Sequence, residues 1–462
     1  MQTPRAIAGD LLALAGLPPE LTGWLDLTGE EPALPSSFRV GAAAQATIAA
    51  AGLAAAAIWR LRTGTAQRVA VDMRHAATEF RSERHLRLDG AAPPDPWDSI
   101  AGLYRTADGW VRLHTNFAHH RDGILALLGC DNSREAVAAA LSRRAAVAFE
   151  SEATAAGMCV AALRSFAEWD AHPHAAALRG RPPVTVERIG PAAPVAFAAN
   201  PTRPLSGVRV LDLTRVIAGP VGARTLAAHG AEVLHITSPH LPNIATLVAD
   251  TGRGKRTAQL DLRNLPGQRR LHDLAAGADV FLQSYRLGAL AAHGFGANAL
   301  AALHPGIVVA SLDAYGETGP WAGKRGFDSL VQTATGFNAA EAEAAGEATP
   351  KVMPAQALDH ASGFLLAVGI CAALHRRATE GGSWRVAVSL AGTGQWLRGL
   401  GRLPGGFAAP DPKQAEIADL LEEMPSSFGR ITAVRHAAIL SATPVPAGLA
   451  PMRLDGGSPA WS

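Results

Sequence analysis

The sequence predicts an α/β protein built on a doubly wound, mostly parallel sheet, with a smaller α+β domain beside it. The first observation is that, between residues 205 and 390, short β-branched runs alternate with helical stretches, as in GVRVLDLT followed by GPVGARTLAAHG. This alternation is typical of parallel sheets whose strands are joined by helices. The second observation is length, because 462 residues exceed what one ordinary domain holds.

The elements of this region can be placed from their apolar periodicity and from the glycines and prolines between them. We expect strands at 207–214, 231–237, 255–262, 279–285 and 306–315, and helices at 219–230 and 266–276. An apolar helix of about 18 residues, by the usual length of such patterns, should lie within 353–390 and end at Gly381-Gly382. The run RVAVSL after it should form a further strand.

Four further segments complete the expected domain organisation. Residues 1–36 are a helical extension, 37–185 an Ala-rich helix with the small α+β domain, 186–204 a Pro-rich linker, and 391–462 a tail without an assigned role. In the small domain, residues 100–115 predict a hairpin around Asp108-Gly109, a strong turn signal. From residue 122 to about 180 the apolar spacing predicts helices.

Composition excludes several classes of protein. The net charge is only +2 and aromatic residues make up 5%, so a nucleic-acid partner is not expected. The three cysteines form no CxxC pair, so we expect neither a metal site nor disulfides, and a cytoplasmic location. Residues 41–59 are long enough to span a bilayer, but they are mostly Ala and Gly, so we predict a buried helix and no membrane partner.

Ligands of doubly wound sheets bind beyond the carboxyl ends of the strands. The residues that follow the predicted strands are Thr214-Arg215-Val216, Ser284-Tyr285 and Asp313 to Tyr315. Gly219-Pro220 opens a helix whose free amides suit a phosphate or carboxylate, although a simple turn fits as well. Arg253, Lys255 and Arg256 form a cationic loop that suits phosphates or is merely solvated. His119-His120 lacks metal-ligand spacing and is expected at the surface.

The candidate catalytic residue is Asp359, in the first turn of the helix within 353–390. The helix dipole favours a negative charge there, so the carboxylate should stay ionised and could act as a nucleophile. The alternative is that Asp359 is only the N-cap of the helix. No GxSxG turn suggests another nucleophile, and no GxGxxG follows the first strand.

An internal repeat involves this same helix. Residues 40–73 align without gaps with 357–390, and the identities include Gly64 with Gly381 and RVAV at 68–71 with RVAV at 385–388. In this register Asp359 lies opposite Ala42. One copy therefore carries the carboxylate and the other does not.

Six motifs occur in an order that resembles the family III CoA-transferases, of the carnitine and bile-acid type. They are PLSGVRVLDLTRVIAGP, LAAHGAEVLHI, GKRTAQLDL, ADVFLQSYRLGAL, HPGIVVASLDAYGETGPWAGKRGFDSL and ALDHASG. The resemblance implies that residues 205–390 are a CoA-binding α/β domain and that dimers interlock. It also implies that the two halves of the family's sequence occur here in swapped order, because residues 40–181 look like the segment that normally follows the catalytic helix.

The resemblance assigns roles to individual residues. Asp359 and Gly363 match the family's D-x-x-x-G pattern, whose aspartate attacks an acyl-CoA thioester and passes CoA to a carboxylic acid through an anhydride and an aspartyl-CoA thioester. CoA is then part of the substrate, with no permanent cofactor or metal. The CoA contacts implied by position are Arg215, Val216, Ala218, Lys255, Ser284, Tyr285 and Tyr315. The family's Gly-rich protective loop is not evident, and PPDPWDSI lies near its place.

Three alternatives to an acyl-CoA transferase remain open. Racemases of the same fold use a His before the Asp of the GFD motif, where this chain has Phe327, and His360 should point about 100° away from Asp359 around the helix. A catalytically silent CoA-binding or assembly subunit is the second alternative, motivated by the swapped order and by Ala42. An oxidoreductase is the third and weakest.

Overall fold

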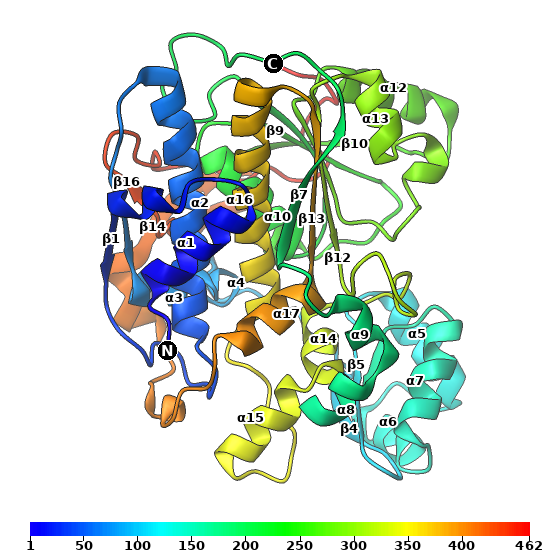
Figure 1. The fold of residues 1–462 in the computed structure, drawn as a ribbon. Coiled ribbons are helices and arrows are strands. Elements are labelled where there is room, and N and C mark those ends of the chain that lie inside the picture. The colour runs from blue at the N-terminus through cyan, green and yellow to red at the C-terminus, as the bar shows by residue number, and fades with distance from the viewer.

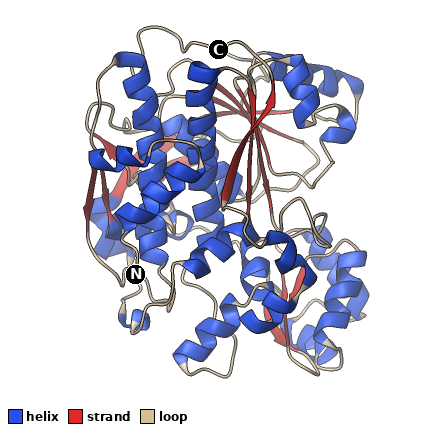
Figure 2. Cartoon of the chain, viewed as in Figure 1, coloured by secondary structure: helices blue, strands red, loops and turns tan.

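The computed structural model describes residues 1–462 and is organised around a seven-stranded sheet. Its strand order is β10-β9-β8-β11-β12-β13-β7, and all neighbours are parallel except β7, which runs antiparallel to β13 at one edge (Figures 1 and 2). The strands are β7 (Val184–Gly190), β8 (Arg209–Leu213), β9 (Glu232–Thr237), β10 (Lys255–Gln259), β11 (Val280–Gln283), β12 (Val308–Asp313) and β13 (Ser383–Ser389). The predicted mostly parallel sheet is confirmed.

Both faces of this sheet are covered by helices. Alternate side chains of β8 belong to different cores, with Val210 in the larger cluster and Leu211 in the smaller one. This alternation follows from the two-residue period of a strand. Helices α10 and α16 lie on one side, and α12 and α13 on the other (Figure 1). The helices are α10 (Ala218–Ala228), α11 (Ala245–Thr251), α12 (Leu265–Ala276), α13 (Ala297–Leu303) and α16 (Ala357–Glu380).

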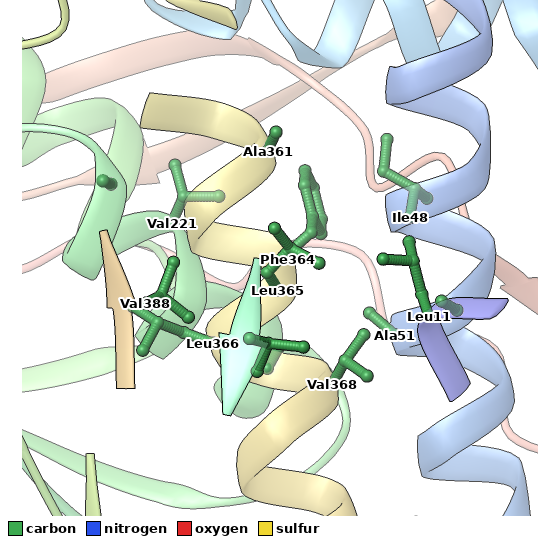
Figure 3. Close-up of a cluster of buried hydrophobic side chains, with 14 of the residues drawn as sticks. Leu11, Ile48, Ala51, Val221, Ala361, Phe364, Leu365, Leu366, Val368 and Val388 are labelled. Carbon is green, nitrogen blue, oxygen red and sulfur yellow. The ribbon is translucent and has the colours of Figure 1, made fainter. Parts of the chain in front are cut away.

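Helix α16 is the central helix of the molecule. It spans 24 residues, longer than predicted, and lies between α10 and α2 (Val40–Thr63), as Figure 3 shows with Val221 on one side and Ile48 and Ala51 on the other. Both α2 and α16 are long and apolar enough to cross a membrane, but the most apolar window of each is wholly buried within the protein. The predicted buried helix at 41–59 is therefore confirmed.

The aligned segments 40–73 and 357–390 have the same local structure. Helix α2 ends at Gly64 and leads to β2 (Val69–Asp72), just as α16 ends at Gly381 and leads to β13. Strand β2 lies between parallel β1 (Leu25–Thr28) and antiparallel β16 (Ile439–Leu440), as β13 lies between parallel β12 and antiparallel β7. The sequence similarity thus extends to strand pairing.

The small domain contains the predicted hairpin. Strands β4 (Gly102–Arg105) and β5 (Trp110–Leu113) pair across the Asp108-Gly109 turn, and β6 (Val160–Ala162) adds to β5. Strand β6 lies in a stretch that is predicted to be helical, so the prediction is wrong there. The Ala-rich run has no strand pattern of its own and becomes a strand only by pairing with β5. The helices here are α5 (Ala118–Leu128), α6 (Arg134–Leu141), α7 (Ala146–Ala155), α8 (Phe166–Ala171), α9 (Pro173–Leu178), α14 (Asp328–Ala334) and α15 (Phe337–Ala345).

Two predicted boundaries are wrong. The linker expected at 186–204 begins inside β7, which completes the main sheet by pairing with a strand about 200 residues away in the chain. The tail expected at 391–462 is also integral, since β15 pairs with β3 and β16 with β2. The remaining elements are α1 (Pro4–Leu14), α3 (Met73–Glu79), α4 (Ser82–His85), β3 (Arg87–Leu88), α17 (Leu390–Gly399), β14 (Leu421–Ser426) and β15 (Gly429–Val434).

The close approach of α16 to α10 depends on Gly363. A methyl group there would come within 2.6 Å of the Ala218 carbonyl oxygen. We predict that Gly363→Ala lowers the free energy of unfolding by about 1–3 kcal/mol, because one helix must shift. Urea denaturation measures the change. Gly399→Ala in α17, where a methyl group meets nothing within 4 Å, is the control and should leave stability unchanged or slightly raised. Equal losses in both variants would contradict the packing argument.

Candidate active site

Asp359 lies in the first turn of α16, but it is not the residue that caps the helix. The N-cap is Gln356, whose side chain makes no capping hydrogen bond. Asp328, at the start of α14, instead accepts the backbone N–H of Asp359 at 2.9 Å. The N-cap interpretation of Asp359 is therefore wrong. Its own carboxyl group accepts no hydrogen bond and remains available, with 8% of the residue exposed.

The surroundings of Asp359 oppose its ionisation. Burial raises its pKa well above the ordinary value, and the nearby carboxylates of Asp328 and Glu83 raise it further. Burial likewise raises the pKa of Asp328, although backbone amides of α16 partly offset this. Burial alone would raise the pKa of Glu83, but the hydrogen bond and charge of His360, at 3.0 Å, together with the charge of Arg84, lower it. The expectation that the helix dipole keeps Asp359 readily ionised is thus corrected, because burial and like charges outweigh it.

A cavity of about 350 Å³ opens on one side of Asp359, at the carboxyl ends of β8, β11 and β12. Five of the predicted binding residues line it, together with Asp359 and Asp313: Arg215, Val216, Ala218, Ser284 and Tyr285. Val216 has a φ of 71°, an uncommon conformation for a β-branched residue, in the turn between β8 and α10. Of the residues predicted around one crevice, all but Thr214 and Tyr315 line this single cavity, which we call the first cavity.

Cationic side chains surround the first cavity. They are Arg215, Arg286, Lys324 and Arg325. The Arg215 guanidinium lies 5.3 Å from the centre of the Phe117 ring, and its backbone N–H donates to Ser284 at 3.3 Å. Such a concentration of guanidinium groups suits phosphate oxygens.

His119 and His120 also line the first cavity, so their predicted surface position is only half right. His119 is exposed, but His120 is buried, and burial lowers its pKa to about 4. A neutral His120 contacts Arg325 at 3.4 Å and the Cys159 sulfur at 3.6 Å. Neither histidine has the companions that a metal site requires, since no cluster of three metal-ligating residues is present.

Two predicted binding residues do not line the first cavity. The Lys255 ammonium is wholly buried, 3.0 Å from Asp212 and 2.9 Å from the Pro220 carbonyl oxygen. Lys255 begins β10 and therefore lies at the amino end of the strand, away from the ligand-binding edge. Tyr315 is also buried, with Trp321 at 5.1 Å between ring centroids. The phosphate-binding interpretation of 253–256 is likewise corrected, because Arg253 pairs with Glu422 and Arg256 with Glu232.

A second cavity, of about 330 Å³, lies on the other side of Asp359. Val216, Phe327 and Asp359 border both cavities. Both halves of the chain line the second cavity, and the first half contributes Glu83, Arg84, Asp95, Trp97, Arg112 and His114. Trp97 belongs to the PPDPWDSI segment, and the His114 ring stacks on Phe327 with centroids 3.6 Å apart. Asp359 thus borders two cavities, each lined by residues from both halves of one chain.

Comparison with known proteins identifies the family. The family described as CoA-transferase family III matches residues 17–203 and 205–401. The chain belongs to this family. An acyl-CoA transferase of Gibberella moniliformis is 28% identical over 78% of this chain and 70% of its own. An acetyl-coenzyme A transferase of Hypoxylon pulicicidum is 35% identical over 43% of this chain and 34% of its own.

Among solved structures, a Mycobacterium tuberculosis protein is 31% identical over 44% of this chain and 58% of that one, with a TM-score of 0.39. The chain spans about half or less of the length of several curated relatives that it matches. Sequence reasoning identified the family and much of the first cavity, but it missed Asp328, Arg112 and His114 as site residues. Asp328 lies in the GFDSL motif, and Arg112 and His114 lie in the predicted hairpin, but no local pattern indicates that these side chains line a cavity beside Asp359.

The raised pKa of Asp359 makes a prediction about stability. A carboxyl group whose folded-state pKa is raised costs stability once pH exceeds that of the unfolded group, and the cost grows until the folded pKa is passed. Asp359→Asn should therefore stabilise the protein at pH 8, by about 1.4 kcal/mol per unit of raised pKa, with little gain near pH 4. Thermal unfolding across this range measures it. Asp273→Asn, at an exposed position of α12, is the control, and an equal gain at both pH values would contradict the prediction.

Proposed function

We propose that this protein is an acyl-CoA transferase that moves CoA from an acyl-CoA thioester to a carboxylic acid through Asp359. The observation that carries the proposal is the position of Asp359, whose carboxyl group has no hydrogen-bond partner and borders both cavities. The cationic first cavity suits the phosphates of CoA, and the second suits the acyl group. Membership of CoA-transferase family III supports this chemistry.

In the proposed reaction, an Asp359 carboxylate oxygen attacks the thioester carbonyl carbon, the C–S bond breaks, and CoA leaves as a thiolate. The resulting mixed anhydride is attacked by that thiolate at the aspartyl carbonyl carbon. The donor acid then leaves as a carboxylate, and an aspartyl-CoA thioester remains. The acceptor carboxylate repeats the two steps in reverse, so that it departs as a CoA thioester and the Asp359 carboxylate is restored.

The electrostatics of the site fit this cycle. Only the ionised form of Asp359 is a nucleophile, and a carboxylate with a raised pKa is a stronger one than an ordinary aspartate. The same burial and neighbouring charges also favour the mixed anhydride and the aspartyl-CoA thioester, since Asp359 carries no charge in either. Asp328 and Glu83 thus favour the covalent intermediates over the free carboxylate.

We further propose that the segment 40–73 is a duplicate of the catalytic segment 357–390 that lacks the acid, with the family's halves in swapped order. The matching bounds and strand pairings of the two segments support this. We place the protein in the cytoplasm and propose that it forms a homodimer. Interlocking is not needed to complete the site, because Glu83 and Arg112 of the same chain already reach the cavity beside Asp359.

The covalent intermediate is directly testable. Incubation with a panel of acyl-CoA esters should add CoA to the peptide that contains Asp359, with loss of one water, as detected by mass spectrometry. Asp359→Ala should form no adduct. Asp313→Asn, which alters the other carboxyl group of the first cavity, should still form it.

Other outcomes of this experiment discriminate between functions. No adduct with any ester would favour a catalytically silent binding or assembly subunit. Deuterium uptake at the α-carbon without an adduct would favour an acyl-CoA racemase, for which His114 supplies an imidazole next to Phe327. That imidazole is a poor base, because burial lowers its pKa to about 3.

The acid limb of the pH profile should depend on Asp328. Asp328→Asn removes a negative charge that raises the pKa of Asp359, yet its amide oxygen can still accept the Asp359 N–H. We predict that the acid limb of kcat/KM moves to lower pH, so that the variant retains more of its activity at pH 5 than the wild type does. Steady-state kinetics between pH 5 and 9 measures the limb. An unchanged limb, or one moved to higher pH, would contradict the proposed coupling.

A further inference from the structure

The second cavity contains a buried cation without a partner. Arg112, on β5, is 8% exposed and lines the cavity beside Asp359. Its guanidinium donates no hydrogen bond, and two of its nitrogens, Nε and Nη1, are buried without a partner. Buried guanidinium groups are normally paired, because their unmet donors are costly. Arg112 is therefore a buried positive charge that lacks a counter-ion within the protein.

The guanidinium is held in place and stays charged. It lies 5.6 Å from the centre of the Trp97 ring, so the aromatic face supports it. Burial lowers the pKa of Arg112 only to about 10, well above neutral pH. Asp328 is the acidic group that raises the pKa of Arg112, but no ion pair joins the two side chains. A positive charge thus faces the cavity at the pH at which the protein works.

Apart from Asp359, the acidic groups of the second cavity already have partners. Glu83 contacts His360 at 3.0 Å and Arg84 at 3.8 Å. Asp328 accepts the Asp359 N–H, and Asp95 accepts the backbone N–H of Trp97 at 3.0 Å. None of these groups offers Arg112 a hydrogen bond. The unmet donors of Arg112 therefore call for an anion from outside the protein.

The anion that fits is not the carboxylate that reacts at Asp359. Arg112 acts on the pKa of Asp328, whereas the pKa of Asp359 responds to burial, Asp328 and Glu83. No hydrogen bond or ion pair joins the guanidinium to the Asp359 carboxyl group, so Arg112 does not contact the nucleophile. A cavity of about 330 Å³ between them has room for a short carbon chain, being on the order of ten water volumes.

We propose that Arg112 binds a second carboxylate at the far end of the acyl group, so that the acid carried by CoA is a short dicarboxylic acid. This inference rests on the proposed CoA transfer and names its substrate class. The reacting carbonyl lies at Asp359, the chain crosses the second cavity, and the distal carboxylate pairs with the Arg112 guanidinium. Arg112 is thus a specificity-determining residue.

The test compares acyl-CoA esters of equal chain length. Wild-type protein should form the Asp359 adduct faster from succinyl-CoA than from butyryl-CoA, and from glutaryl-CoA than from pentanoyl-CoA. Arg112→Met should lower kcat/KM for the dicarboxylic esters by about 100-fold, since a buried charged hydrogen bond is lost. Its rate with the monocarboxylic esters should stay the same or rise. Arg105→Met, an exposed arginine of the same hairpin, should change neither.

A binding measurement separates this inference from the catalytic proposal. Free glutarate should raise the melting temperature of the wild type and of Arg105→Met but not of Arg112→Met, and pentanoate should raise none of them. Equal kcat/KM for both ester classes, or an equal loss with both in a folded Arg112→Met, would overturn the inference while leaving CoA transfer standing. Absence of adducts from every ester would overturn the catalytic proposal, whereas the glutarate shift would still report the carboxylate site. A large fall in the melting temperature of Arg112→Met without ligand would show a structural role instead.

Discussion

The hydrogen bond from the Asp359 backbone to Asp328 is the interaction on which the site depends. Because Asp328 meets the free N–H at the start of α16, the Asp359 side chain need not fold back to cap its own helix. The same contact places the Asp328 carboxylate beside Asp359 in a buried site, where burial raises the pKa of both groups and the Asp328 charge raises that of Asp359 further. One capping interaction thus leaves the carboxyl group of the proposed nucleophile without a hydrogen bond and places beside it a charge that raises its pKa.

The position of that contact follows from the packing of the central helices. Gly222 and Gly363 let α10 and α16 approach closely, and α10 itself begins at the carboxyl end of β8. The start of α16 is therefore held at the ligand-binding edge of the main sheet. On its other side, α2 packs along α16 and brings the first half of the chain to the same place. The two cavities are a consequence of this three-helix arrangement.

The first cavity could be predicted because it is a property of topology. Once the strands are placed in the sequence, the residues after β8 and β11 must meet at one edge, and Arg215 and Tyr285 do so. Lys255 shows the limit of that reasoning. Its motif assigned it to CoA binding, but Lys255 is the first residue of β10, and its ammonium group forms a buried ion pair with Asp212. Whether a cation is free or paired depends on partners that are remote in sequence.

The sequence alone determined the family, the parallel sheet, the buried α2 and α16, and Asp359 as the candidate nucleophile, because each depends on local periodicity or on contiguous motifs. Only the tertiary structure decided that Asp328 rather than Asp359 contributes the cap, that β7 belongs to the main sheet, and that Arg112 faces the second cavity unpaired. These features join residues about 30 to 250 positions apart in the chain. Such contacts arise from packing, which no short stretch of sequence encodes.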